Sequence, residues 1–160
     1  MSGAALQMFS HGIMTALFFA VVGTVRDLWH DKVVRDVLKA KHALERLEIL
    51  FENHAGLISE HETLCLVLDG LVMEMDGVNP AFMAALRDIF ADLIAFIERI
   101  IQKGQAAGQV RSDLDAHLVT LNIVGMLEGS TIPWMLNRGD VDYAAMMTTL
   151  QQMLVDGLRP

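Results

Sequence analysis

The sequence predicts an all-α protein of about six helices, and three observations support this. Apolar residues recur with the 3.6-residue helical period through most of the 160-residue chain. No stretch alternates apolar and polar residues in the way that a half-buried strand does. Capping residues and glycine-containing turns divide the chain into segments of helix length. A chain of this length can bury one substantial core.

Residues 1–30 are predicted to form an apolar N-terminal helix, followed by a helical domain over residues 31–160. No charged side chain precedes Arg26, and residues 4–25 are long enough to span a membrane. A secretory signal is disfavoured because the basic start is missing. The helix either spans a membrane, lies in a membrane surface or packs against the rest of the protein. The surface helix is disfavoured, because its polar face lacks Lys and Arg.

Three short stretches in this opening segment are LQMFSHG from Leu6, ALFF from Ala16 and VG from Val22. Over residues 1–27 the chain resembles one transmembrane helix of the antiporter-like, chain-4-type membrane subunits of respiratory complex I. Those subunits move protons through buried Lys and Glu, and none of these charged positions occurs here. The resemblance therefore implies an origin, by fusion or by a rearranged reading frame, rather than an activity.

The next two helices are predicted over residues 31–53 and from Ser59 to about Met75. Apolar residues in the first of them follow the helical period, and Gly56 is a plausible stop. In the second, Ser59 and Glu62 have the spacing of a capping box, in which the two side chains each satisfy a free backbone amide.

A long amphipathic helix is predicted from Asn79-Pro80 to about Lys103, because Asn is a good cap and proline suits the first helical position. Residues 104–112 form the following turn, with two glycines and no apolar period. Two more helices are then predicted, from Asp113 to about Leu136 and, capped by Asp140, to Val155.

The turn reads QKGQAAGQVRSDLD over residues 102–115, and the next helix contains NIVGMLEG over residues 122–129. Together with NPAF at residues 79–82, these motifs resemble the C-terminal regulatory domain of TetR-family transcriptional repressors, over about residues 31–160. The resemblance implies a helical bundle with an internal ligand cavity, and two C-terminal helices that pair with their copies in a homodimer. TetR repressors also carry an N-terminal helix-turn-helix unit, which the sequence lacks; residues 1–30 stand in its place.

The residues themselves are compatible with such a dimer. Gly125 and Gly129 are four apart on one helical face and would allow close helix approach, although packing inside one monomer is the alternative. The predicted dimer interface comprises Leu118, Leu121, Gly125, Gly129, Ile132, Met146, Leu150, Met153 and Leu154.

An apolar small-molecule ligand is the second expected partner. The apolar sides of three helices should converge, and Met and Phe linings suit such a ligand. The same residues would also describe a plain hydrophobic core. The predicted ligand-binding residues are Phe51, Cys65, Met73, Phe90, Ile94 and Ile97.

Composition and motifs argue against several other functions. The net charge is −8, and the one basic stretch, residues 32–46, has acidic residues interleaved, so this chain should not bind nucleic acid directly. No phosphate loop, nucleophile elbow or dinucleotide motif occurs, so neither an enzyme nor a cofactor is expected. His61 and Cys65 lie one helical turn apart, but no second Cys is available and a metal is not expected. The single cysteine fits a reducing compartment, which predicts a cytoplasmic protein.

The sequence therefore predicts a dimeric ligand-binding regulatory domain of the TetR type without a DNA-binding head. The alternative is a membrane-anchored helical protein, related through its N-terminus to a respiratory NADH dehydrogenase subunit, with membrane contact through residues 4–25. A gene product with a fold but no selected role is the third interpretation.

Overall fold

The computed structural model describes residues 20, 23–24, 26–75, 79–137 and 139–160. In this part of the chain the all-α prediction is confirmed, because every regular element is a helix. None of these helices is both long and apolar enough to cross a lipid bilayer. The predicted N-terminal helix lies mostly outside the described residues, as does the segment that resembles a complex I subunit.

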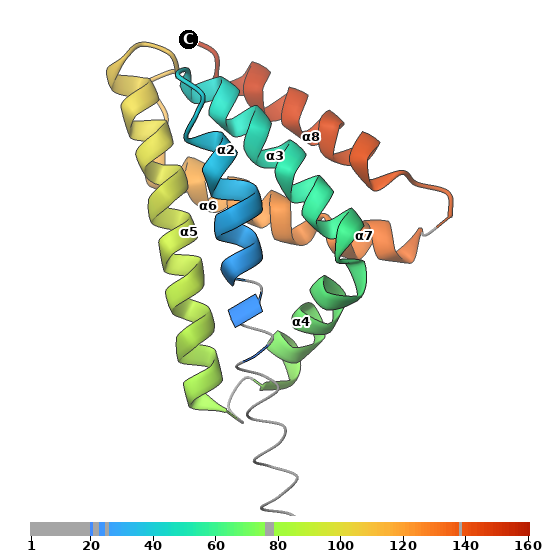
Figure 1. Ribbon diagram of the computed structural model, residues 1–160. Helices are drawn as coiled ribbons and strands as arrows, with labels where there is room; N and C mark the ends of the chain where they lie inside the picture. Colours follow the sequence, from blue (N-terminus) through green and yellow to red (C-terminus); the bar gives the residue numbers. More distant parts are fainter. Residues whose placement is uncertain (1–19, 21–22, 25, 76–78, 138) are drawn as a thin grey trace, which may run out of the picture.

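The elements are a π-helical turn, η1 (Trp29–Val34), and the α-helices α2 (Arg35–Val37), α3 (Ala43–Glu60), α4 (Glu62–Met75), α5 (Pro80–Ala106), α6 (Ala116–Gly129), α7 (Thr131–Leu136) and α8 (Tyr143–Leu158). Helix α3 is central and packs against η1, α2, α4, α5 and α8. In Figure 1, α3 and α8 run side by side, and the long helix α5 forms the opposite side of the molecule. The largest fully buried side chains include Phe51, Leu47, Leu50, Ile97, Ile101, Ile123, Leu127 and Met147.

The helix predicted over residues 31–53 is wrong in its boundaries. It is interrupted after α2, and α3 begins only at Ala43. The backbone N–H of Ala43 donates to Oε1 of Gln109 at 2.8 Å, and Nε of Arg46 donates to the Ala40 carbonyl at 2.9 Å. The cap of α3 is thus supplied by a residue far along the chain, which local sequence signals do not reveal.

Gly56 does not end α3, contrary to the prediction. It is exposed, and the next turn buries Leu57 and Ile58. A glycine inside a helix costs about 1 kcal/mol relative to alanine, which this burial outweighs. The chain breaks at His61 instead, so Ser59 lies inside α3 and does not cap α4.

The predicted cap at Asn79 is confirmed, because its Oδ1 accepts a hydrogen bond from the N–H of Phe82 at 3.0 Å. The two later helix starts are displaced from Asp113 and Asp140. Asp115 caps α6 and Asp142 caps α8, each accepting a hydrogen bond from a backbone N–H of its helix. All four are acidic residues before an apolar run, so sequence alone did not separate the caps from their neighbours.

The single helix predicted over residues 113–136 is divided at Ser130 into α6 and α7. The Ser130 hydroxyl donates to the Leu127 carbonyl at 2.7 Å and also shares a hydrogen bond with the hydroxyl of Tyr143 at 2.8 Å. The rings of Tyr143 and Trp134 pack 5.0 Å apart. The first residue of α8 therefore holds the break between α6 and α7.

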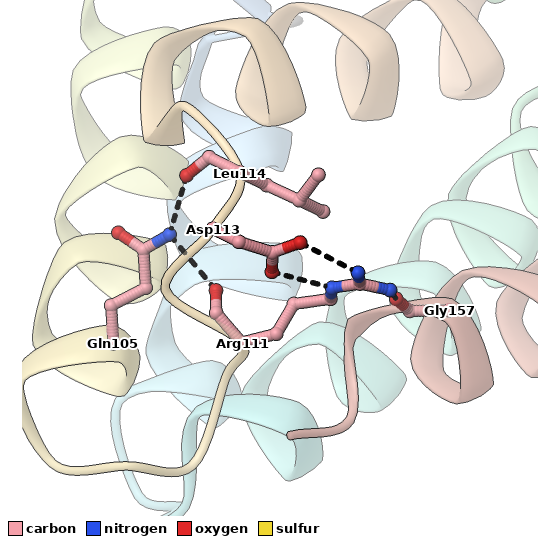
Figure 2. Close-up of polar contacts among 5 residues, drawn as sticks. All are labelled: Gln105, Arg111, Asp113, Leu114 and Gly157. Carbon is pink, nitrogen blue, oxygen red and sulfur yellow. Dashed lines mark hydrogen bonds and ion pairs between the residues drawn. The ribbon is translucent and has the colours of Figure 1, made fainter.

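The turn between α5 and α6 is fixed by hydrogen bonds to several backbone groups, as Figure 2 shows. Gln105 donates to the carbonyls of Arg111 and Leu114, at 3.1 and 2.8 Å. The guanidinium of Arg111 binds both carboxylate oxygens of Asp113 and also reaches the Gly157 carbonyl at the end of α8. These hydrogen bonds lower the pKa of the Asp113 carboxyl. The turn motif therefore ties the C-terminus of α5 to the C-terminus of α8.

Two glycines in the turn have separate roles. Gly108 has φ +68°, a left-handed conformation that glycine adopts without strain, and it follows the end of α5. Gly104 is buried inside α5, where a Cβ would lie 2.5 Å from the Cβ of Ala43 and 2.7 Å from Cγ2 of Val110. The structure thus places Gly104 in α5, rather than in the predicted turn, at a close approach between two helices.

Candidate functional site

A cavity of about 70 Å³ lies between η1, α3, α4 and the α6–α7 junction. Its lining is mostly apolar, with a few polar side chains from different elements. The lining residues are Leu28, Trp29, His54, Leu57, Ile58, His61, Leu64, Cys65, Glu128 and Thr131. An apolar cavity with a few converging polar groups is typical of a small-molecule binding site.

His54 is a deeply buried polar side chain of this cavity, with 4% of its surface exposed. Neither of its ring nitrogens makes a hydrogen bond of acceptable geometry, although the Leu127 carbonyl lies near the ring. Its ring meets that of Trp29 edge to face, with centroids 6.5 Å apart. Burial lowers the pKa of His54 to about 4, against a smaller opposing effect of the nearby Leu127 carbonyl. The imidazole is therefore uncharged at neutral pH.

Three more polar side chains reach the cavity from other elements. His61 lies at the break between α3 and α4, and its Nε2 is also buried without a hydrogen-bond partner. Glu128 is half-buried near the end of α6, and the hydroxyl of Thr131 donates to the Glu128 carbonyl at 2.9 Å. Over the residues that the structure describes, no three His, Cys, Asp or Glu side chains are placed to hold a metal ion.

The sequence analysis missed His54, although a signal was present. His54 follows Leu50 by four residues and Phe51 by three, so it continues the apolar stripe of α3. A histidine in such a stripe is buried, but only the structure shows that it lacks partners. Glu128 also lines the cavity and is half-buried. In the sequence, a carboxylate among apolar residues indicates either a ligand or dimer partner or a partly solvated helix position.

The predicted ligand-binding residues are only partly brought together around the cavity. Five of them belong to one hydrophobic cluster: Phe51 and Ile97 are buried, with Cys65, Phe90 and Ile94 packed against it. Among the predicted residues, Cys65 also lines the cavity. Met73 lies in α4, but its side chain is outside the described part of the structure. The set stays a prediction.

A second cleft, of about 250 Å³, lies between η1 and α5, and Trp29 is part of its lining as well. Arg26 and Arg99 line it together with His30 and Asp92, and aromatic side chains of Trp29 and Phe96 complete its wall. Because Trp29 also lines the apolar cavity, the two hollows are neighbours that share one side chain.

The predicted dimer residues of α6 and α8 lie largely on an open apolar face. Leu118 is 59% exposed and Met153 is 69% exposed. Gly125 and Gly129 are exposed as well, and a Cβ at either one would meet nothing within 4 Å.

The other predicted dimer residues divide between exposed and half-buried positions. Leu121 and Ile132 are exposed, whereas Met146, Leu150 and Leu154 are half-buried. An apolar groove of about 300 Å³ runs between α6 and α8 and is lined in part by Leu150, Met153 and Leu154.

Comparison with protein families gives a match over residues 43–150, to the family described as "Tetracyclin repressor-like, C-terminal domain". A curated relative, the fatty acid metabolism regulator protein of Bacillus subtilis (strain 168), is 20% identical over 128 residues. The match covers 80% of this chain and 64% of that relative, so the chain spans less than two thirds of its length.

Solved structures share the fold. The transcriptional regulator FadR from Bacillus subtilis, in complex with stearoyl-CoA, aligns with a TM-score of 0.70 and 20% identity, over 90% of this chain and 74% of that one. AibR, in complex with isovaleryl coenzyme A and operator DNA, aligns with a TM-score of 0.70 and 17% identity, over 88% of this chain and 74% of that one.

Proposed function

The chain belongs to the family of tetracyclin repressor-like C-terminal domains, and we propose that it binds a fatty acyl thioester and dimerises as the regulatory domain of a TetR-type transcriptional regulator. It is not proposed to catalyse a reaction, and a cytoplasmic location follows from this role. The observation that carries the proposal is the pair of hollows that share Trp29 in their linings. The relatives that bind stearoyl-CoA and isovaleryl coenzyme A support the ligand class.

An acyl-CoA has an apolar chain and a phosphorylated head, which match the two hollows. The apolar cavity suits the acyl chain. The second cleft has Arg26 and Arg99 for phosphate groups, and Trp29 and Phe96 offer aromatic faces on which a base can stack.

The size of the cavity suggests how binding acts on the fold. An apolar cavity of about 150 Å³ holds a benzene molecule, and its volume is about twice that of the cavity present here, about 70 Å³. A longer acyl chain must therefore separate α3 and α4, and toward the core it meets the cluster with Phe51 and Ile97. A ligand that prefers the separated arrangement shifts the population of the two packings, and this is how the ligand controls the regulator.

The ligand class is tested by titrating the protein with acyl-CoAs from butanoyl to stearoyl, with coenzyme A alone as the reference. A Trp134→Phe variant leaves Trp29 as the fluorescent reporter of the site, and calorimetry supplies the affinities. We expect acyl-CoAs to bind on the order of a hundredfold more tightly than coenzyme A, because several buried methylene groups contribute about 0.8 kcal/mol each. If no acyl-CoA binds more tightly than coenzyme A alone, the proposed ligand class is wrong.

We further propose that the open face of α6 and α8 is the homodimer interface. Exposed apolar side chains there, such as Leu118 and Met153, are 59% and 69% exposed in one chain. An apolar patch of this kind on an acidic protein marks an interaction surface. A second copy would cover the same helices in both partners, and the exposed Gly125 and Gly129 allow the helices to approach closely.

The dimer is tested by size-exclusion chromatography with light scattering in detergent-free buffer, where twice the chain mass is expected. Leu118→Glu should raise the dissociation constant of the dimer at least about tenfold, because it places a charge in an apolar interface. Leu38→Glu is the matched control, since Leu38 is equally exposed but lies at the end of α2. A monomeric wild-type protein, or equal effects of both substitutions, would remove this interface from the proposal.

A further inference from the structure

The buried nitrogens around the apolar cavity lack partners to an unusual degree. Among the described residues, the buried side-chain polar atoms without a hydrogen-bond partner are Nδ1 and Nε2 of His54 and Nε2 of His61, the last of which lies 3.9 Å from Oε2 of Glu60. Both residues line the same cavity. Buried polar groups in folded proteins are nearly always hydrogen-bonded, and those that are not call for an explanation. One explanation is a ligand that supplies the missing hydrogen-bond partner.

The ring nitrogens of His54 cannot gain hydrogen bonds by a rotation of the side chain toward bulk water. Its side chain is 4% exposed, and the ring of Trp29 packs against it edge to face. The Leu127 carbonyl lies near the ring, and His61, Cys65 and Glu128 line the same cavity. The open space beside the imidazole is therefore the cavity itself.

The protonation state of His54 defines the chemistry that it offers. A neutral imidazole carries one N–H donor and one bare nitrogen that accepts. The N–H can donate to a carbonyl oxygen of a ligand. A carboxylate in the same place would be an anion in an apolar cavity that Glu128 also lines, without a cationic imidazole to pair with.

We propose that His54 selects the ligand by donating a hydrogen bond to an uncharged carbonyl oxygen, that of the acyl thioester, and that the cavity discriminates against a free carboxylate. This inference rests on the proposed function and specifies the polar group that the site recognises. The apolar part of the ligand supplies affinity, whereas His54 supplies the distinction between ligands of equal apolar size.

The test compares two ligands that differ in one oxygen atom. They are the acyl-CoA that binds most tightly in the series above and the S-alkyl coenzyme A thioether of the same chain length, which lacks the carbonyl. Calorimetry on the wild-type protein should show a preference of about five- to tenfold for the thioester, as expected for one hydrogen bond between neutral groups. The free fatty acid of that chain length should bind more weakly than its methyl ester, a pair in which neither ligand carries the coenzyme A head.

His54→Phe keeps the size and the contact with Trp29 but removes both ring nitrogens. It should bind the thioester and the thioether equally, with the affinity for the thioether unchanged. Its melting temperature should rise, because two unpartnered buried nitrogens are gone. His42→Phe is the matched control at an exposed histidine, and it should keep the wild-type preference.

The outcomes separate the inference from the proposed function. Equal binding of thioester and thioether by the wild-type protein, or an unchanged preference in His54→Phe, overturns the role of His54 and leaves the acyl-CoA proposal intact. The wild-type comparison needs no variant, so it decides the matter even if His54→Phe does not fold. Binding of none of the acyl-CoAs overturns both.

Discussion

Replacing Gly104 by alanine is expected to lower the free energy of unfolding by about 3 kcal/mol, because the added methyl group has no space. Its Cβ would lie 2.5 Å from the Cβ of Ala43 and 2.7 Å from Cγ2 of Val110. The Cβ of Ala43 is bonded directly to the backbone of α3, so the clash can be relieved only by moving α3 away from α5. Val110 is 2% exposed and cannot turn outward.

Gly56→Ala is the matched control for this substitution. Gly56 also lies inside a helix, but a Cβ there would meet nothing within 4 Å. Alanine should stabilise the protein at this site by up to about 1 kcal/mol, through its better helix propensity. Urea unfolding of both variants measures the difference. Equal and small effects at the two sites would show that α3 and α5 do not approach closely at Gly104.

Lowering the pH from 7 to 4 is expected to remove about 3 kcal/mol of stability through His54 alone. Burial lowers the pKa of His54 from 6.5 to about 4 in the folded protein. As the pH falls below 6.5, the unfolded chain takes up a proton that the folded protein does not, and the folded state becomes less stable. Below about pH 4 both states are protonated and the loss levels off.

The contribution of His54 is isolated by comparing the wild-type protein with His54→Phe at several pH values between 7 and 4. The variant should lose much less stability over this range. Hydrogen bonds from Lys39 and Arg111 lower the pKa of Asp36 and Asp113, so these carboxylates stabilise the fold at higher pH and lose that effect as the pH falls further. Both carboxylates are present in the wild-type protein and in the variant, so their contribution to the free energy of unfolding cancels when the two pH profiles are subtracted. Parallel pH profiles would contradict the buried, neutral His54.

A helix start was predictable where the cap is next to its helix in the sequence and no second candidate cap is close by. Asp113 and Asp140 each lie two residues before the true caps of α6 and α8, so those starts were displaced. Asn79 with Pro80 located the start of α5, because the cap accepts from an amide three residues away. The start of α3 was not predictable, because the first backbone N–H of the helix donates to the side chain of Gln109. That residue lies just after the C-terminus of α5, far from α3 in the sequence. The end of α6 at Ser130 depends likewise on Tyr143, the first residue of α8.

The family resemblance rested in part on the turn after α5, and the structure gives several of its residues a physical role. Gly108 takes the left-handed conformation, Val110 is buried, and Arg111 pairs with Asp113 while reaching the end of α8. Such contacts restrict the residue types at each position, which is why a short motif indicated the fold.

The sequence by itself determined the helical class, the amphipathic faces and the turn that identifies the family, because helix period, caps and turns are local properties of the chain. Only the tertiary structure decided which faces meet. The cavity beside His54 and the contact of Gly104 with Ala43 depend on how helices far apart in the sequence cross. A small change in a crossing angle would close the cavity or separate Gly104 from Ala43. The sequence pattern of a single helix does not indicate that angle.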